Sequence, residues 1–137
     1  MIKINIINFE NIYLLENFIL LNKSKYFRYY CNRNINVINN HLLTIILTKN
    51  NKIIGYGHLD KAIKIWLGIC VLEEYKSQGY GKMILNYLID YSKNNKIEKI
   101  YLTVDKENII AKNLYEKYNF MIDETTQKIY KMVKVFK

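Results

Sequence analysis

The chain has 137 residues, half of them hydrophobic, which predicts one compact domain with a buried core and argues against a disordered protein. Its formal net charge of +9 favours an anionic partner, but the lysines are scattered, so a nucleic-acid binder is not expected. Lys and Asn interrupt every apolar run before the roughly 18 residues of a membrane span. Residues 1–5 lack a signal-peptide layout, so we expect Cys31 and Cys70 to be reduced thiols of a cytoplasmic protein.

The hydrophobic pattern alternates between strand and helix periods. In chain order it predicts a strand at residues 2–8, a helix at 9–21 and, within 24–40, a short or irregular helix followed by a loop. Strands are predicted at 41–49, 52–60 and 62–72, then a helix at 81–94, a strand at 96–104, a helix at 108–119 and two closing strands, the last at 126–136. Asn50 and Asn51 are typical of a tight hairpin turn. The run at 62–72 is the most continuously apolar, which favours a central strand buried on both faces. The order indicates an α/β domain with a mixed sheet and helices on both faces.

Two glycines, Gly79 and Gly81, stand directly before the helix predicted at 81–94. Amide N–H groups at a helix N-terminus lack helical partners and, with the helix dipole, attract anions, while glycine lets the backbone approach a bulky anion. This spacing matches neither the Walker loop nor the dinucleotide fingerprint. The pattern alone leaves two interpretations open, a phosphate cradle and an ordinary strand-to-helix turn.

The stretch from about residue 65 to 120 resembles the acetyl-CoA-binding core of the GCN5-related N-acetyltransferase (GNAT) superfamily. The run Lys76-x-x-Gly79-x-Gly81 is similar to the family signature Arg/Gln-x-x-Gly-x-Gly/Ala. A second motif, Asn-x-x-Ala-x-x-x-Tyr-x-x-x-Gly-Phe, is matched by Asn108, Ala111, Tyr115 and Phe120. Lys replaces the usual Arg or Gln at a position that acts largely through its backbone. Asn119 replaces the usual Gly, and Asn tolerates the left-handed conformation expected there.

The resemblance implies a single domain over residues 1–137, of α/β (mixed α+β) class. Its central sheet would be mixed, mostly antiparallel and six- or seven-stranded, with about four helices on both faces. The strands near 65–72 and 97–104 would splay apart at a bulge, and the pantetheine arm of acetyl-CoA would lie between them. The residues that the resemblance assigns to the cofactor are Ile69, Cys70, Val71, Lys76, Ser77, Gln78, Gly79, Tyr80, Gly81, Lys82, Asn108, Ala111 and Tyr115.

Within that set, the resemblance implies particular roles. An N–H near Ile69 would face the thioester oxygen, and residues 76–82 would hold the pyrophosphate. Tyr115 would protonate the leaving thiolate of CoA; its alternative interpretation is a packing aromatic on an amphipathic helix. Cys70 is not expected to carry the acyl group, because a buried thiol without a paired histidine stays protonated.

The acceptor amine must lose a proton before it attacks, yet residues 65–68 carry no acid. His58 and Asp60, on the adjoining predicted strand, are the nearest candidate bases, with a structural histidine as the alternative for His58. The segment 24–41 and the hairpin would form the acceptor site, with basic side chains suited to a phosphate or carboxylate, unless that segment is a solvated basic helix. The candidate acceptor-binding residues are Arg28, Tyr29, Arg33, His41 and His58.

The sequence therefore predicts an acetyl-CoA-dependent N-acetyltransferase that acts by direct transfer without a metal ion. The expected acceptor is an anionic small-molecule amine, such as an amino sugar phosphate or a nucleotide-linked amino sugar. A protein N-terminus or lysine is the alternative acceptor, and a non-catalytic acyl-CoA sensor is the alternative of another class. The protein is expected to be a monomer or a homodimer.

Overall fold

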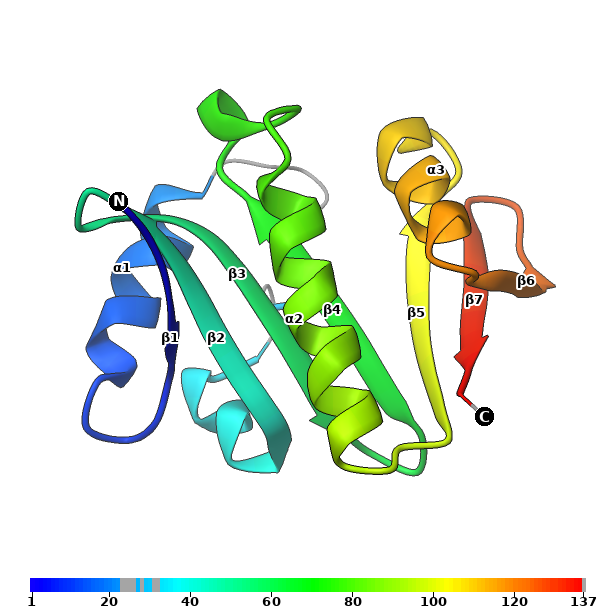
Figure 1. Ribbon diagram of the computed structural model, residues 1–137, viewed down its shortest axis with the longest axis horizontal. Coiled ribbons are helices and arrows are strands. Elements are labelled where there is room, and N and C mark those ends of the chain that lie inside the picture. The colour runs from blue at the N-terminus through cyan, green and yellow to red at the C-terminus, as the bar shows by residue number, and fades with distance from the viewer. Residues whose placement is uncertain (23–26, 28, 31–32, 137) are drawn as a thin grey trace.

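The computed structural model describes residues 1–22, 27, 29–30 and 33–136 (Figure 1). Its elements are β1 (Ile2–Ile6), α1 (Ile12–Leu21), the 3₁₀ helix η1 (Ile35–Asn40), β2 (His41–Lys49), β3 (Lys52–Lys61), β4 (Ile65–Val71), the 3₁₀ helix η2 (Glu73–Tyr75), α2 (Tyr80–Asn94), β5 (Lys99–Asp105), α3 (Ile109–Lys117), β6 (Met121–Thr125) and β7 (Ile129–Val135). The predicted order of strands and helices is confirmed. In the stretch 24–40, where a short or irregular helix followed by a loop was predicted, the 3₁₀ helix η1 lies at the end; residues 24–26, 28 and 31–32 lie outside the described residues.

The described strands form one sheet in the order β1-β2-β3-β4-β5-β7-β6. Every neighbouring pair is antiparallel except β4 with β5, so the sheet is mixed and mostly antiparallel, as predicted. Asn50 and Asn51 join β2 to β3 with φ angles of 50° and 69°. Positive φ at both central residues matches the twist of a two-residue hairpin, which confirms the predicted turn.

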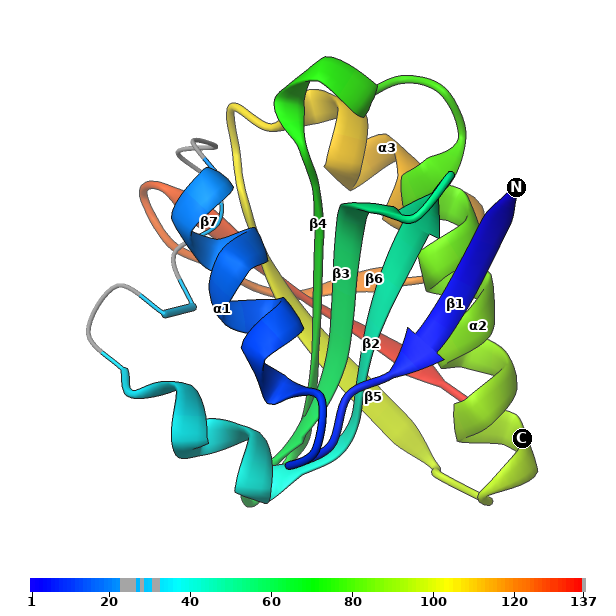
Figure 2. The same ribbon diagram turned by 90° about the vertical axis from the view of Figure 1, so that its left-hand side faces the viewer.

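Helices cover both faces of the sheet. In Figures 1 and 2, α2 lies on one face of β3 and β4 and α1 lies on the other, while α3 is on the α2 side, over β5. Close approach of α2 depends on bare backbone in β3: a Cβ added to Gly55 or Gly57 would lie 2.8 or 2.5 Å from the Ile84 side chain. Because Gly55 and Gly57 are two residues apart, both lie on the face of β3 toward α2, and the missing side chains let the helix pack closely.

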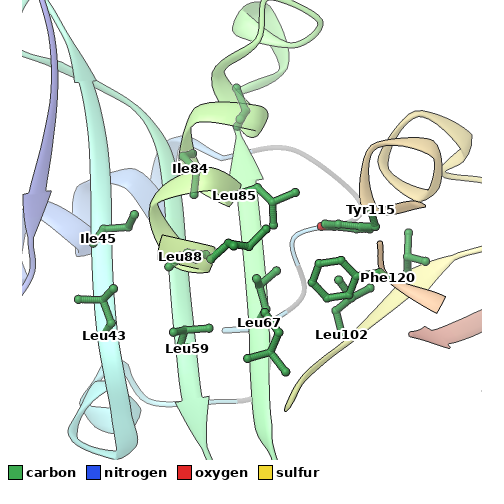
Figure 3. Packing of buried hydrophobic residues seen from close by; sticks show 14 of the residues in the cluster. Leu43, Ile45, Leu59, Leu67, Ile84, Leu85, Leu88, Leu102, Tyr115 and Phe120 are labelled. Atoms are coloured by element: carbon green, nitrogen blue, oxygen red, sulfur yellow. The ribbon is translucent and has the colours of Figure 1, made fainter. Parts of the chain in front are cut away.

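Two apolar cores result, one on each face. The larger core lies between the sheet and α2 and α3 and includes Ile45, Leu59, Leu85 and Leu102 (Figure 3). The smaller core lies under α1 and includes Phe18 and Tyr56, whose rings stack 6.2 Å apart. No helix in the described part of the chain is long and apolar enough to cross a membrane.

The most buried strands are β2 and β3, each with six consecutive buried residues. β4 is the central strand of the sheet order, as predicted, but only Leu67, Cys70 and Val71 of its seven residues are buried. The prediction that this run is buried on both faces is therefore wrong for most of it. The reason lies in the next strand, because β5 does not run alongside β4.

β4 and β5 touch at one end and then separate. Their only recorded pair is Trp66 with Tyr101, near the start of each parallel strand, and Figure 1 shows the two strands diverging beyond it. The splay predicted between these strands is thus confirmed. The bulge predicted with it is absent from the β3–β4 pairing, whose register runs unbroken from Lys61–Ile65 to Gly55–Val71. Divergence of β5, rather than a bulge against β3, opens the sheet.

Candidate functional site

The edge of β4 that faces the splay carries unpaired backbone groups. Leu72 N–H donates to Ile54 O at 2.9 Å. Because the β3–β4 register is unbroken, this bond determines which residues of β4 direct their backbone groups toward β3. Backbone groups of successive strand residues point to opposite edges, so Gly68 and Cys70 face β3 whereas Ile69 and Val71 face β5. Beyond the Trp66 pair, β5 provides no ladder partner for this edge. The backbone groups of Ile69 and Val71 therefore face the splay, as their predicted pairing with a pantetheine arm requires.

Cys70 is placed differently. Its backbone faces β3, and its side chain lies in the core under α1, where its Sγ accepts a hydrogen bond from Asn22 Nδ2 at 2.8 Å. Burial raises the pKa of the Cys70 thiol to about 11, so the thiol is protonated at neutral pH. A contact between Cys70 and the cofactor is not supported by this placement. The expectation that the thiol carries no acyl group agrees with it.

The glycine turn continues this edge into α2. Gly79 is the N-cap residue with φ of 90°, and the first helical amide to be satisfied is Met83 N–H, which donates to Gly79 O at 3.1 Å. The amides of Tyr80, Gly81 and Lys82 therefore have no helical acceptor. A Cβ added to Gly81 would meet only Leu114 and Val71, at 3.8 and 3.9 Å, which is ordinary contact. Packing within the chain thus tolerates a small side chain at Gly81, and its absence leaves space beside β4.

Cationic side chains surround this turn. Lys76 Nζ lies 2.7 Å from Glu73 Oε2, and Ser77, Gln78 and Lys82 are exposed. Two further lysines come from the β2–β3 hairpin: Lys49 Nζ lies over the Tyr80 ring at 5.6 Å, and Lys52 Nζ lies over the Tyr75 ring at 5.3 Å. Hydrogen bonding to Tyr80 raises the pKa of Lys49. Sequence reasoning missed Lys49 and Lys52, because only the fold brings the hairpin beside the turn.

The ends of α3 follow the predicted pattern. Asn108 is the N-cap residue, and its side chain accepts from Ala111 N–H at 3.4 Å. At the other end, Asn119 has φ of 68°, and Phe120 N–H donates to Tyr115 O at 3.1 Å, the bonding of a left-handed C-terminal cap. These caps fix the helix that carries Tyr115.

Tyr115 presents a protonated hydroxyl to the splay. Its ring is 8% exposed and packs edge-on against Phe120 with centroids 5.7 Å apart. Figure 3 shows its hydroxyl pointing away from α3 toward Leu85 and Leu67 of the facing elements. Burial raises the pKa of Tyr115 well above its ordinary value. No described buried side-chain polar atom lacks a partner and this hydroxyl bonds none of the described residues, so it reaches solvent.

On the α1 side of the sheet, the predicted acceptor residues come together. Tyr29 hydroxyl donates to Asp60 Oδ2 at 3.0 Å and lies 2.8 Å from His41 Nε2, while Arg33 lies over the Tyr29 ring at 4.3 Å. His41 Nδ1 is 2.7 Å from Thr44 Oγ1. Arg28 lies outside the described residues. Four positions separated by up to 31 residues in the chain therefore form one polar cluster.

His58 belongs to the same cluster and is 3% exposed. Its Nδ1 lies 2.7 Å from the Tyr56 hydroxyl, which is 2.7 Å from the Tyr30 hydroxyl. The ring rests on Gly68, where an added Cβ would lie 2.4 Å from His58 Cε1. Tyr30, Tyr56 and Gly68 were not predicted. The one available signal was the i, i+2 spacing of Tyr56 and His58, which places both on the same face of β3.

Burial keeps both histidines neutral. It lowers the pKa of His41 to about 4 and that of His58 well below its ordinary value, and for His58 the neighbouring His41 and Arg33 act in the same direction. Burial, with the Asp60 carboxylate, also raises the pKa of Tyr29 to about 12. The near-neutral pKa expected of His58 as a base is therefore not met. At neutral pH the cluster holds neutral imidazoles and phenols, with Arg33 at its exposed side.

Comparison with known proteins places this geometry in a family. Residues 7–120 match the model of the Acetyltransferase (GNAT) family. The uncharacterized N-acetyltransferase YobR of Bacillus subtilis is 38% identical over 66 residues, which are 48% of this chain and 24% of that protein. The [ribosomal protein bS18]-alanine N-acetyltransferase of Haemophilus influenzae is 35% identical over 82 residues, 57% of this chain and 54% of that protein. The chain thus spans between about a quarter and half of these relatives.

The fold is shared with solved acetyltransferase structures. The PaiA N-acetyltransferase of Thermoplasma acidophilum, solved in complex with coenzyme A, superposes with a TM-score of 0.76 at 20% identity, covering 99% of this chain and 99% of that one. In this chain, the splayed strands β4 and β5 and the helices α2 and α3 lie inside the region matched by the family model. Because that match covers well over half of the sequence, this chain belongs to the GNAT acetyltransferase family.

Proposed function

We propose that this protein is an acetyl-CoA-dependent N-acetyltransferase that transfers the acetyl group directly to a primary amine. The observation that carries the proposal is the unpaired β4 edge at Ile69 and Val71, which continues into the free amides at the start of α2. Bound acetyl-CoA would supply an activated acetyl thioester.

The donor site has the groups that a CoA molecule requires. The N–H and C=O groups of Ile69 and Val71 can pair with the amides of a pantetheine arm, as an added strand would. The amides of residues 80–82 can bind a pyrophosphate, and Lys49, Lys52 and Lys82 add positive charge nearby. Gly81 has no side chain, so the backbone of this turn stays accessible to such an anion.

Two groups are suited to stabilising the reaction. The Ile69 N–H faces the splay and is a preorganised donor for a thioester oxygen on which negative charge builds during attack; such a donor typically contributes about 2.7–4 kcal/mol. Tyr115 is neutral and its hydroxyl reaches the same space from α3, so it can give a proton to a departing thiolate. The two groups approach from opposite sides of the splay.

Deprotonation of the acceptor falls to the α1-side cluster or to water. An alkyl ammonium has a pKa near 10.4, so only about one molecule in a thousand is neutral at pH 7. Asp60 is the charged acceptor in the cluster and is bonded to Tyr29. We propose that Asp60, directly or through water, receives this proton. The buried, neutral His58 is the weaker candidate.

For the acceptor, we propose a small anionic amine, such as an amino sugar phosphate or a nucleotide-linked amino sugar. Arg33 supports this choice, because it is exposed and held over the Tyr29 ring at the outer side of the cluster. A protein N-terminus is the second candidate, which the similarity to a ribosomal-protein alanine N-acetyltransferase favours. A reduced, buried Cys70 supports a cytoplasmic location, and the protein would act as a monomer or a homodimer.

Release of CoA, measured with a thiol reagent against a panel of amines, tests the proposal. The panel contains amino sugar phosphates, nucleotide-linked amino sugars, peptides with free N-termini and N-terminally blocked lysine peptides. Turnover with the first two groups supports the small-molecule acceptor, and turnover only with free N-termini supports the second candidate. Tight acetyl-CoA binding without turnover on any amine would instead favour an acyl-CoA sensor.

A further inference from the structure

The chain contains two histidines, and their rings lie face to face on the α1 side of the sheet. His41 and His58 have centroids 4.6 Å apart and planes inclined by 26°. A neutral imidazole carries its proton on one nitrogen and offers a lone pair on the other, so the hydrogen-bond partners decide what each ring presents. For both histidines these partners are described residues of this chain.

The hydrogen bonds of His41 assign its proton to Nε2. The Tyr29 hydroxyl has a single hydrogen and donates it to Asp60 Oδ2, a carboxylate that only accepts. The contact of 2.8 Å between Tyr29 and His41 must then be donated by Nε2–H. His41 Nδ1 is left as an acceptor for the Thr44 hydroxyl at 2.7 Å. Each donor in this chain of bonds has one acceptor.

The hydrogen bonds of His58 lead to the same tautomer. Its Nδ1 lies 2.7 Å from the Tyr56 hydroxyl. A phenol is an acidic donor and an imidazole nitrogen is a basic acceptor, so the favoured bond runs from Tyr56 O–H to Nδ1. Tyr56 can then accept from the Tyr30 hydroxyl at 2.7 Å. This direction satisfies all three groups and leaves the proton of His58 on Nε2.

The ring of His58 is held so that Nε2 lies over β4. An added Cβ on Gly68 would meet Cε1 at 2.4 Å and Nε2 at 2.7 Å, so this edge of the ring crosses from β3 onto the bare backbone of its neighbour. Tyr29 and His41 pack on the ring at 4.4 and 4.6 Å, and Arg33 lies beyond Tyr29. Nε2 bonds none of the described residues, and no described buried polar atom lacks a partner, so this nitrogen is not completely enclosed by them.

We infer that His58 is a hydrogen-bond donor of the acceptor site, which presents Nε2–H rather than a lone pair beside Gly68. The ligand atom that accepts this hydrogen bond is a carbonyl, carboxylate or phosphate oxygen of the bound acceptor amine. Tyr56 is then a positioning residue, because its bond to Nδ1 fixes both the ring and the tautomer. This inference rests on the proposed function for the identity of the ligand, but not for the tautomer.

The tautomer is measured directly by long-range ¹H–¹⁵N NMR of the full chain at pH 7. Only two imidazoles contribute, and a His41→Gln variant assigns the signals. The inference predicts a protonated Nε2 and an unprotonated Nδ1 for His58. In Tyr56→Phe, which keeps the ring volume and removes the donor, the Nδ1 signal should shift and the two tautomers should mix. A protonated Nδ1 in the wild-type protein would overturn the inference.

Two substitutions test donation during turnover. His58→Gln keeps an N–H donor near the position of Nε2 but cannot act as a base, and His58→Leu keeps the bulk without a donor. With the best amine from the panel, His58→Leu should lower kcat/KM by roughly 10-fold or more, and His58→Gln by less than about threefold. Equal losses in both variants would overturn the donor role. Acetyl-CoA affinity should be retained in both.

Failure of the proposed function is distinguishable from failure of this inference. If wild-type protein neither binds acetyl-CoA nor turns over any amine, the proposed function fails, while the ¹⁵N spectrum still decides which nitrogen of His58 carries the proton. If turnover is normal and the spectrum shows Nδ1–H, the enzyme assignment stands and the donor inference fails.

Discussion

Lowering the pH from 7 to 5 should already destabilise this protein, although most carboxylates titrate only at lower pH. In an unfolded chain, His41 has a pKa near 6.5, whereas burial lowers its folded pKa to about 4. Protonation therefore favours the unfolded state. The contribution of neutral His41 to the free energy of unfolding is complete above pH 6.5 and is lost as the pH falls toward 4.

The loss expected between pH 7 and pH 5 follows from these two values. One group that titrates at about 4 when folded and 6.5 when unfolded loses about 2 kcal/mol over that interval, and solvent around the half-buried ring reduces this to roughly 1–2 kcal/mol. His58, whose pKa is lowered further by complete burial, acts in the same direction. Over this interval the ordinary pKa values of Asp, Glu, Tyr and Lys leave the two histidines as the main titrating groups.

Urea unfolding followed by circular dichroism at pH 7, 6 and 5 measures this loss as a fall in the free energy of unfolding. His41→Gln removes one of the two titrating groups, so its free energy of unfolding should fall less steeply over the same interval. Constant or increasing stability of the wild-type protein from pH 7 to pH 5 would refute the placement of two neutral histidines in the cluster.

Three substitutions test other parts of the account. Tyr115→Phe should lower kcat by roughly 10²–10⁴ with little change in acetyl-CoA affinity, measured by steady-state kinetics and calorimetry, because the hydroxyl serves the departing thiolate; an unchanged kcat would remove that role. Gly57→Val should destabilise the fold by about 1–3 kcal/mol in urea unfolding, since even its Cβ would lie 2.5 Å from Ile84; wild-type stability would contradict the close packing of α2. Gly81→Ala should weaken acetyl-CoA binding by about tenfold or more in calorimetry without changing Tm appreciably, whereas Asn86→Ala, at an exposed position of the same helix, should bind normally; equal affinities would argue against a cradle at the turn.

Local features of the fold were predictable from short stretches of sequence. The hairpin at Asn50 and Asn51, the cap at Asn108 and the left-handed Asn119 each depend on a few neighbouring residues. The degree of burial of β4 was not predictable in this way. It depends on the direction that β5 takes after Tyr101, which no pattern within 62–72 records.

The acceptor cluster was predicted by residue but not by chemistry. Tyr29, Arg33, His41, His58 and Asp60 were all candidates, and the register of β2 with β3 brings the three strand residues His41, His58 and Asp60 together beside the segment before η1. What the sequence did not reveal was their burial, which removes the near-neutral pKa expected of His58. Gly68 becomes a partner of His58 only once β3 is paired with β4, and Tyr30 reaches Tyr56 only when the segment before η1 packs on the sheet.

Amide chemical-shift mapping with CoA tests the central claim most directly. The amides of Ile69 and Val71 face the splay, and those of Tyr80, Gly81 and Lys82 begin α2 without helical acceptors. Titration of ¹⁵N-labelled protein with CoA should shift these five amides most strongly and leave β6 unaffected. No shifts at millimolar CoA, or shifts confined to β6 and β7, would contradict the account.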